Sequence, residues 1–271
     1  MKKFSAIENY AATYEHLLPS VREVLMLTDA ERMSKISLER WILYPKAKMV
    51  LERLEELYSW PLRLRMPNML IIGPTNNGKT TLVTHFMRSR KPWRHSGYKD
   101  ERTIIPVVKI QMPPRPNLPL IYATILEALK VPHTPSAHIN KLQPQALDAF
   151  RRHETRMFIV DEVHDIRNAT TQAQYQILSL FKYLGNELQI PIIGVGTEAA
   201  AQAFRIDPQM ANRFEPYTLP RWDNLNLTLQ LLASFACMLP LKKPSRLIDP
   251  QIGKLVLNLT DGSIGDITTL M

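Results

Sequence analysis

The stretch Gly73-Pro-Thr-Asn-Asn-Gly-Lys-Thr80 matches the phosphate-binding loop pattern G-x-x-x-x-G-K-[ST] and decides the fold of this chain. An apolar run, Met69–Ile72, leads into it, and a helix-compatible run, Thr81–Met87, follows it. The helix N-terminus and the loop N–H groups are expected to bind the phosphates of ATP, while Lys79 reaches the β- and γ-phosphates and Thr80 holds Mg²⁺. The residues expected to contact the nucleotide here are Gly73, Pro74, Thr75, Asn76, Asn77, Gly78, Lys79, Thr80 and Thr81.

Two acids end a second apolar run, Met157-Phe-Ile-Val-Asp161-Glu162. A strand that is buried on both faces brings its last residue to the carboxyl edge of a parallel sheet, where such sheets bind ligands. Asp161 is therefore predicted to orient Mg²⁺ or its water. Glu162 is predicted to act as the catalytic base on the attacking water.

Two further polar positions are candidates for the same site. Thr197 follows the apolar run Ile190–Gly196, where it could contact the γ-phosphate or cap the next helix, and the two roles are compatible. Arg213 precedes the last predicted strand, Phe214–Leu219, and an arginine there can act in trans on the nucleotide of a neighbour. Arg205 is the alternative to Arg213, and an ordinary surface role remains open for both.

Short β-rich runs alternate with helix-length segments, which is typical of an α/β fold with a parallel sheet between helices. These runs are Met69–Gly73, Ile104–Ile110, Met157–Asp161, Ile190–Gly196 and Phe214–Leu219. We predict an N-terminal helical segment over 1–65, an α/β nucleotide-binding core with a five-stranded parallel sheet over 66–220, and a small helical lid over 221–271. The last helix has no stop signal before Met271, so we expect a truncated C-terminus.

Charge and composition limit the possible partners and the compartment. The net charge is +9, and residues 88–115 carry eight basic residues against two acids. This stretch favours a polyanion such as DNA or RNA, but a solvated basic face is an equally good interpretation. The single Cys237 fits a reducing compartment, the histidines lack metal-ligand spacing, and no apolar run has the length of a membrane span. We therefore expect a soluble, cytoplasmic protein without a membrane partner.

The order of these motifs resembles that of the AAA+ P-loop ATPases. The amino-acid sequence of several stretches is similar to that of the TniB and TnsC transposition regulators. The matching stretches are Arg40-Trp-Ile-Leu-Tyr-Pro45, Arg65–Lys79, Val160-Asp-Glu-Val-His164, Leu184-Gly-Asn-Glu-Leu188, Val195-Gly-Thr197, Asn212-Arg-Phe-Glu-Pro216 and Leu232-Ala-Ser-Phe235. They extend over most of the chain from about residue 40 to 265.

The resemblance implies that ATP lets protomers assemble as a ring or filament around double-stranded DNA, which recruits a DDE transposase and TniQ. It leaves open whether a CRISPR effector complex takes part. Hydrolysis would disassemble the filament. It makes Arg213 the arginine finger and places Tyr44 and Pro45 near the adenine. The residues that it implies for the DNA backbone are Arg115, Thr134, Ser136, Lys141 and Arg167. Many AAA+ proteins have a sensor arginine where Gly262-Ser-Ile-Gly-Asp266 presents an acid, so weaker coupling of the lid to the γ-phosphate is expected.

Three alternatives remain at this stage. The first is a helicase-loader-like AAA+ ATPase whose client is a helicase. The second is a P-loop small-molecule kinase, although Glu162 directly after Asp161 suits activation of water better than of an acceptor hydroxyl. The third is a binding module that hydrolyses nothing.

Overall fold

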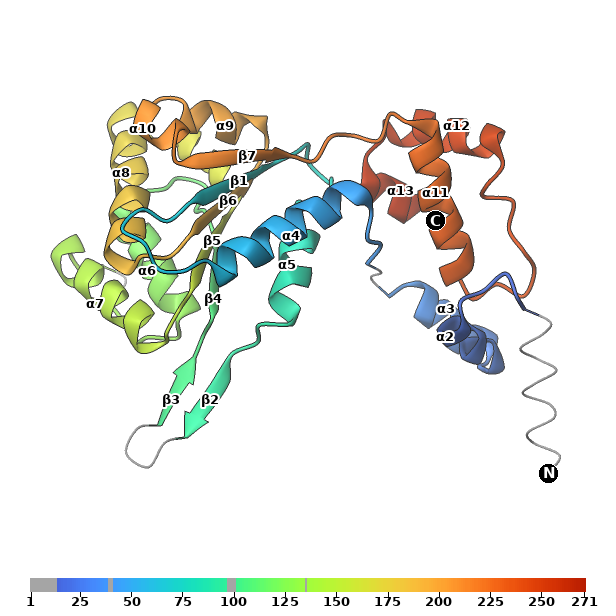
Figure 1. The fold of residues 1–271 in the computed structure, drawn as a ribbon, viewed down its shortest axis with the longest axis horizontal. Coiled ribbons are helices and arrows are strands. Elements are labelled where there is room, and N and C mark those ends of the chain that lie inside the picture. The colour runs from blue at the N-terminus through green and yellow to red at the C-terminus, as the bar shows by residue number, and fades with distance from the viewer. Residues whose placement is uncertain (1–13, 39–40, 97–100, 135) are drawn as a thin grey trace. The chain divides into compact units, whose positions relative to one another are not determined.

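The computed structural model describes residues 14–38, 41–96, 101–134 and 136–271. The chain divides into two compact units (Figure 1). One is Pro45–Pro220, and the other combines the chain up to Tyr44 with Arg221–Met271. The first boundary thus differs from the predicted one at residue 65. The helix α4 (Pro45–Ser59) buries one face and stacks Tyr58 edge-on against Phe86, so it belongs to the α/β unit.

A five-stranded parallel sheet forms the centre of the unit Pro45–Pro220, which confirms the predicted fold class. Its order is β4 (Val107–Gln111), β5 (Met157–Asp161), β6 (Ile192–Gly196), β1 (Asn68–Ile72) and β7 (Phe214–Thr218). Every residue of β1, β5 and β6 is buried, as expected for strands covered on both faces. The carboxyl ends of these three strands therefore meet at one edge, where the phosphate loop begins.

Helices cover both faces of this sheet (Figure 1). On one face, Leu70, Ile72 and Val160 join the main apolar core with side chains from the helices between β4 and β7. These helices are α6 (Leu118–Ala128), α7 (Ile139–Arg152), the 3-10 helix η2 (Val163–Asn168), α8 (Thr171–Leu188), α9 (Glu198–Phe204) and α10 (Pro208–Ala211). Because side chains alternate along a strand, Met69 and Asp161 point to the other face, which α4 and α5 (Lys79–Arg88) cover.

A two-stranded antiparallel hairpin, β2 (Trp93–Ser96) and β3 (Glu101–Ile104), is inserted between α5 and β4 (Figure 1). The predicted strand Ile104–Ile110 is therefore wrong as one element. Ile104 ends the hairpin, and β4 starts at Val107 after Pro106, which has no N–H for a ladder.

The basic stretch 88–115 is partly neutralised inside the chain, since at least three of its basic residues form ion pairs within the described ranges. Arg90 pairs with Glu55, Arg102 with Glu154 at 2.5 Å, and Lys109 with Asp161 at 2.9 Å. Lys99 lies outside the described residues. The positive charge that this segment offers to a polyanion at its surface is thus smaller than its sequence suggests.

The second unit is helical. It contains α2 (Pro19–Arg22), the 3-10 helix η1 (Glu23–Met26), α3 (Asp29–Ile36), α11 (Leu225–Met238), α12 (Pro250–Thr260) and α13 (Ile264–Leu270). The N-terminal segment is tied to the C-terminal helices, because Leu18 N donates to Cys237 O at 3.1 Å and Arg32 donates to Pro240 O at 3.2 Å. The predicted lid therefore packs with residues that the sequence assigned to a separate segment.

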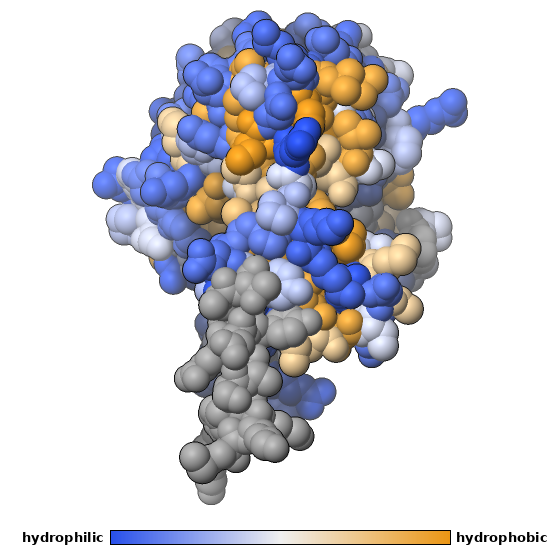
Figure 2. Space-filling model, turned by 90° about the vertical axis from the view of Figure 1, so that its right-hand side faces the viewer, coloured by the Kyte–Doolittle hydropathy of each residue, from blue (hydrophilic) through white to orange (hydrophobic). Residues whose placement is uncertain are grey.

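Asp266, the acid of Gly262–Asp266, and several exposed apolar side chains belong to this helical unit. Asp266 lies in the first turn of α13, where the helix dipole favours a negative charge. Large apolar side chains remain exposed, among them Ile248, Leu255 and Leu259, and Figure 2 shows apolar surface interspersed with hydrophilic side chains. Among the helices of the described residues, none is long and apolar enough to cross a membrane.

Candidate nucleotide site

Glycine is required at two positions of the phosphate loop. The loop leaves β1 after Ile72 and enters α5 at Lys79. A Cβ on Gly73 would lie 2.7 Å from the backbone oxygen of Leu219, and Gly73 N donates to Gly196 O at 3.1 Å. Gly78, the N-cap of α5, has a φ of +74°, which glycine adopts without the steric cost of a Cβ. The loop is therefore held tightly between β6 and the segment after β7.

Lys79 is the first residue of α5, and its side chain turns back to the start of the loop. Its side chain is buried, and Nζ donates to Gly73 O at 3.0 Å and to Pro74 O at 2.6 Å. Burial lowers the pKa of the Lys79 ammonium below its usual 10.5, and the carboxylates of Glu162 and Asp161 oppose that shift. A phosphate would offer this ammonium a stronger, charge-assisted partner than the two carbonyls.

The two predicted magnesium ligands come together from different elements. Thr80 Oγ1 in the first turn of α5 donates to Asp161 Oδ2 at the end of β5, at 3.0 Å. The Asp161 side chain is 6% exposed, and Oδ1 accepts the Glu162 N–H at 3.0 Å. A hydroxyl and a carboxylate are the hard oxygen donors that Mg²⁺ prefers, so these residues fit the metal.

Sequence reasoning missed Lys109, which also reaches Asp161. Its Nζ lies 2.9 Å from Asp161 Oδ2, the same oxygen that accepts the Thr80 hydroxyl. The sequence placed Lys109 in a basic surface stretch. A lysine inside the otherwise apolar run Val107–Ile110 was the available signal, because a charge on such a strand needs a partner.

Glu162 follows Asp161 in a left-handed backbone conformation, with φ +52° and ψ +35°. Non-glycine residues adopt this region at some cost, and such strained residues cluster at functional sites. The carboxylate Oε2 lies 3.1 Å from His164 Nδ1, although this contact lacks the angles of a good hydrogen bond. The side chain is 39% exposed, so water can reach it.

Thr197 lies beside the phosphate loop, because the preceding Gly196 accepts the Gly73 N–H. By position it is the N-cap of α9, but within the described chain its side chain makes no capping hydrogen bond. The structure therefore places Thr197 next to the site, and its contact with the γ-phosphate stays a prediction.

Arg213 lies at the amino ends of the parallel strands, whereas its own phosphate loop lies at their carboxyl ends. Phe214, the next residue, pairs with Asn68 at the start of β1, whereas the loop follows the end of that strand. A strand of five residues separates the two edges by roughly 16 Å. Arg213 donates to Asn186 Oδ1 at 3.1 Å, and Arg205 is exposed at the C-cap of α9.

The predicted DNA contacts fall into two groups, and all five of their side chains are exposed. Arg115 follows β4 and Arg167 lies in η2 after β5, and their loops are joined because Asn168 Nδ2 donates to Pro114 O at 3.2 Å. In the second group, Thr134 and Ser136 lie between α6 and α7, and Lys141 lies in the first turn of α7. Across the described ranges no hydrogen bond links this group to Arg115 or Arg167.

Tyr44 belongs to the helical unit, where its ring packs edge-on against Trp222 with a centroid distance of 5.1 Å. Burial raises the pKa of the Tyr44 hydroxyl to about 12. Pro45 is the first residue of α4 in the other unit. Their contact with the adenine stays a prediction.

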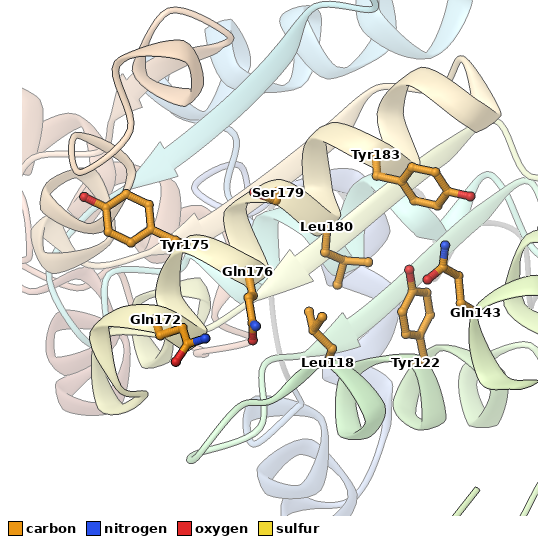
Figure 3. A pocket seen from close by; sticks show the side chains of 9 residues that line it. All are labelled: Leu118, Tyr122, Gln143, Gln172, Tyr175, Gln176, Ser179, Leu180 and Tyr183. Carbon is orange, nitrogen blue, oxygen red and sulfur yellow. The ribbon is translucent and has the colours of Figure 1, made fainter. Parts of the chain in front are cut away.

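A separate groove of about 430 Å³ lies between α6, α7 and α8 (Figure 3). In Figure 3, Tyr122 and Tyr183 lie on either side of Gln143. The groove is lined by Leu118, Tyr122, Gln143, Gln172, Tyr175, Gln176, Ser179, Leu180 and Tyr183. Since none of these side chains carries a formal charge at neutral pH, the groove does not favour phosphate, and the loop at Gly73–Thr80 remains the candidate nucleotide site.

The sheet order, the phosphate loop and the Thr80–Asp161 contact together define a P-loop nucleotide-binding protein of the Walker type. Comparison with known proteins agrees. Residues 32–224 match the family described as "Bacterial TniB protein", and the chain belongs to that TniB family. No curated protein matches the chain.

Solved structures with the same fold include a Walker-type ATPase of Pyrococcus abyssi, with 16% identity and a TM-score of 0.53, over 82% of this chain and 64% of the other. Cdc6p of Pyrobaculum aerophilum has 14% identity and a TM-score of 0.55, over 87% of this chain and 62% of its own. Drosophila ORC bound to DNA has 14% identity and a TM-score of 0.54, over 84% and 59%. The chain thus spans less than two thirds of each of these proteins.

Proposed function

We propose that this TniB-family protein is an ATPase that assembles with ATP on double-stranded DNA and regulates transposition by recruiting a DDE transposase and TniQ. The observation that carries the proposal is the convergence of Lys79, Thr80 and Asp161 at the mouth of the phosphate loop. A cation, a hydroxyl and a carboxylate in this arrangement suit a nucleoside triphosphate with its magnesium ion. The family membership supports the role in transposition.

In the proposed hydrolysis, Lys79 and the N–H groups at the start of α5 hold the phosphates, while Thr80 and Asp161 hold Mg²⁺. The metal would neutralise charge on the β- and γ-phosphates when bound. Glu162 takes a proton from the attacking water, which its exposed carboxylate can meet. Thr197 orients that water or the γ-phosphate from the adjoining strand.

Self-assembly would complete this site. Arg213 lies at the far edge of the sheet and cannot serve its own loop, but a neighbouring protomer stacked edge to edge would bring its Arg213 to the γ-phosphate. An arginine supplied in trans stabilises the charge of the transferring phosphoryl group. ATP would then favour the oligomer because it is bound by two protomers.

DNA binding is proposed for the exposed arginines 115 and 167, whose loops are hydrogen-bonded to each other. Their guanidinium groups suit phosphate oxygens and would give backbone contacts without base readout. One of the structures that share the fold, Drosophila ORC, is bound to DNA, which supports such a role. Thr134, Ser136 and Lys141 would add contacts from the second group.

Fluorescence anisotropy with a random-sequence duplex tests this proposal. Affinity should be higher with a non-hydrolysable ATP analogue than with ADP, and it should fall as salt rises. Replacing both Arg115 and Arg167 by Ala should weaken binding and reduce the salt slope by about two. The matched control is Arg63→Ala, an exposed arginine between α4 and β1. Equal affinity with both nucleotides would contradict the proposal.

A further inference from the structure

Lys109 is the one charged side chain of the strand β4. Its neighbours Val107, Val108 and Ile110 are buried, and its own side chain is 23% exposed. Strand alternation directs it to the same face as Asp161, since Lys109 pairs with Ile159, two residues before Asp161. The strand register therefore holds the lysine stem beside the carboxylate at the end of β5.

The carboxylate of Asp161 has a protein partner on each oxygen. Oδ1 accepts the Glu162 N–H, and Oδ2 receives both the Thr80 hydroxyl at 3.0 Å and the Lys109 ammonium at 2.9 Å. A divalent cation held by Thr80 and Asp161 needs this same Oδ2, directly or through a water. It would also meet the positive charge of the ammonium at close range, which is unfavourable in a site that is largely closed to solvent.

We propose that Lys109 is a tethered competitor of Mg²⁺. Its ammonium neutralises Asp161 when the metal is absent and leaves Oδ2 when Mg²⁺ arrives, which the flexible four-carbon stem allows. The lysine thereby lowers the affinity of the protein for free Mg²⁺. Metal capture then depends on the phosphates of a nucleotide, whose negative charge favours the metal over the lysine. This inference rests on the proposed nucleotide site.

Calorimetric titration of the full chain with Mg²⁺ tests the competition. The Mg²⁺ affinity is measured once without nucleotide and once with ADP present. The Lys109→Met variant should bind Mg²⁺ about tenfold more tightly than wild type in both titrations, as expected when one partly buried competing ion pair is lost. Lys109→Arg keeps the positive charge and should stay close to wild type. Lys182→Met is the matched control, because this lysine bonds the neutral Gln209.

A second measurement separates competition from a merely structural ion pair. Without its partner, the buried Asp161 carboxylate should make Lys109→Met melt at a lower temperature than wild type in EDTA. Millimolar Mg²⁺ should raise the melting temperature of this variant more than that of wild type. A structural ion pair alone would leave the response to Mg²⁺ unchanged.

Two results would overturn the inference. Unchanged Mg²⁺ affinity in Lys109→Met would show that the lysine does not compete. Weaker binding of ADP to this variant in EDTA would make Lys109 a phosphate ligand instead. Failure of the nucleotide site itself is distinguishable, because wild type would then not bind ADP, whereas the titration without nucleotide would still report on Lys109.

Discussion

Substitution of Asn77 tests how the phosphate loop is held in shape. Asn77 is 1% exposed, and its side-chain Nδ2 donates to Leu219 O at 2.8 Å and to Pro220 O at 3.0 Å. Both amide protons are therefore used to hold the chain where it leaves β7. The amide oxygen is buried, and among the described residues it has no hydrogen-bond partner. The Asn77 side chain thus fastens the loop to the segment after β7 and does not point at a phosphate.

The expected cost follows from these contacts. Asn77→Ala leaves two carbonyl oxygens without their donor, which costs about 1–3 kcal/mol when the acceptor is buried. Loss of the unpartnered amide oxygen offsets part of this, so we expect a net loss of about 1–2 kcal/mol. Asn77→Asp should cost more, because it sets a carboxylate against the same two carbonyls. Desolvation and these dipoles would raise the pKa of the introduced carboxyl, so its cost should shrink as pH falls.

Hydrogen exchange of amides in β1 and β6 gives the free energy of unfolding of the unit Pro45–Pro220. Asn77→Ala should lower it by the stated amount, and Asn77→Asp should lower it further at neutral pH than at acidic pH. The control is Asn140→Ala, because this asparagine is exposed in the first turn of α7, within the same unit. If Asn77→Ala exchanged like wild type, the two hydrogen bonds would not hold the loop and the reasoning would be refuted.

Three further changes have defined outcomes. Glu162→Gln should abolish phosphate release but retain ATP binding, and so prolong the ATP-bound assembly on DNA. An unchanged lifetime of that assembly would show that Glu162 is not the catalytic base. Gly73→Ala should cost about 1–3 kcal/mol of stability and weaken ADP binding, because its Cβ would meet Leu219 O at 2.7 Å. Gly185→Ala, whose nearest contact would be 3.6 Å, should be tolerated. Burial lowers the pKa of Lys79 in the folded state, so the folded wild type loses this proton at a lower pH than the unfolded chain does. Wild type therefore gains stability as pH rises toward 10.5, and Lys79→Met should become less stable relative to it over this range. Urea unfolding over this range would show a constant difference if the pKa of Lys79 were not lowered.

The sheet and the loop could be predicted because their signals are local. A buried parallel strand needs a continuous apolar run, and a phosphate loop needs glycine at fixed positions. The pattern of Met69–Thr80 therefore predicts the strand, loop and helix that the structure has there. Parallel strands also share a carboxyl edge, which is why Thr80 and Asp161 could be expected to meet.

The parts that escaped prediction depend on distant partners. Lys109 looked like a surface charge because its carboxylate is 52 positions away (161 − 109). The partners of Asn77 at Leu219 and Pro220 are equally remote. The helix α4 has the amphipathic pattern of many surface helices, and only its packing on α5 assigns it to the α/β unit.

The central claim is that each nucleotide site is completed by a neighbouring protomer, and mixing two inactive variants tests it most directly. Lys79→Ala should lack a functional phosphate loop but keep its arginine, whereas Arg213→Ala should keep its loop but lack the arginine. Phosphate release in the presence of duplex DNA should be near zero for each alone and should recover when the two are mixed, because one protomer then supplies Arg213 to the loop of the other. An inactive mixture, under conditions where the protomers exchange, would contradict a shared site. If instead Arg213→Ala were active alone, and Arg205→Ala were inactive alone but recovered when mixed with Lys79→Ala, the arginine finger would be Arg205.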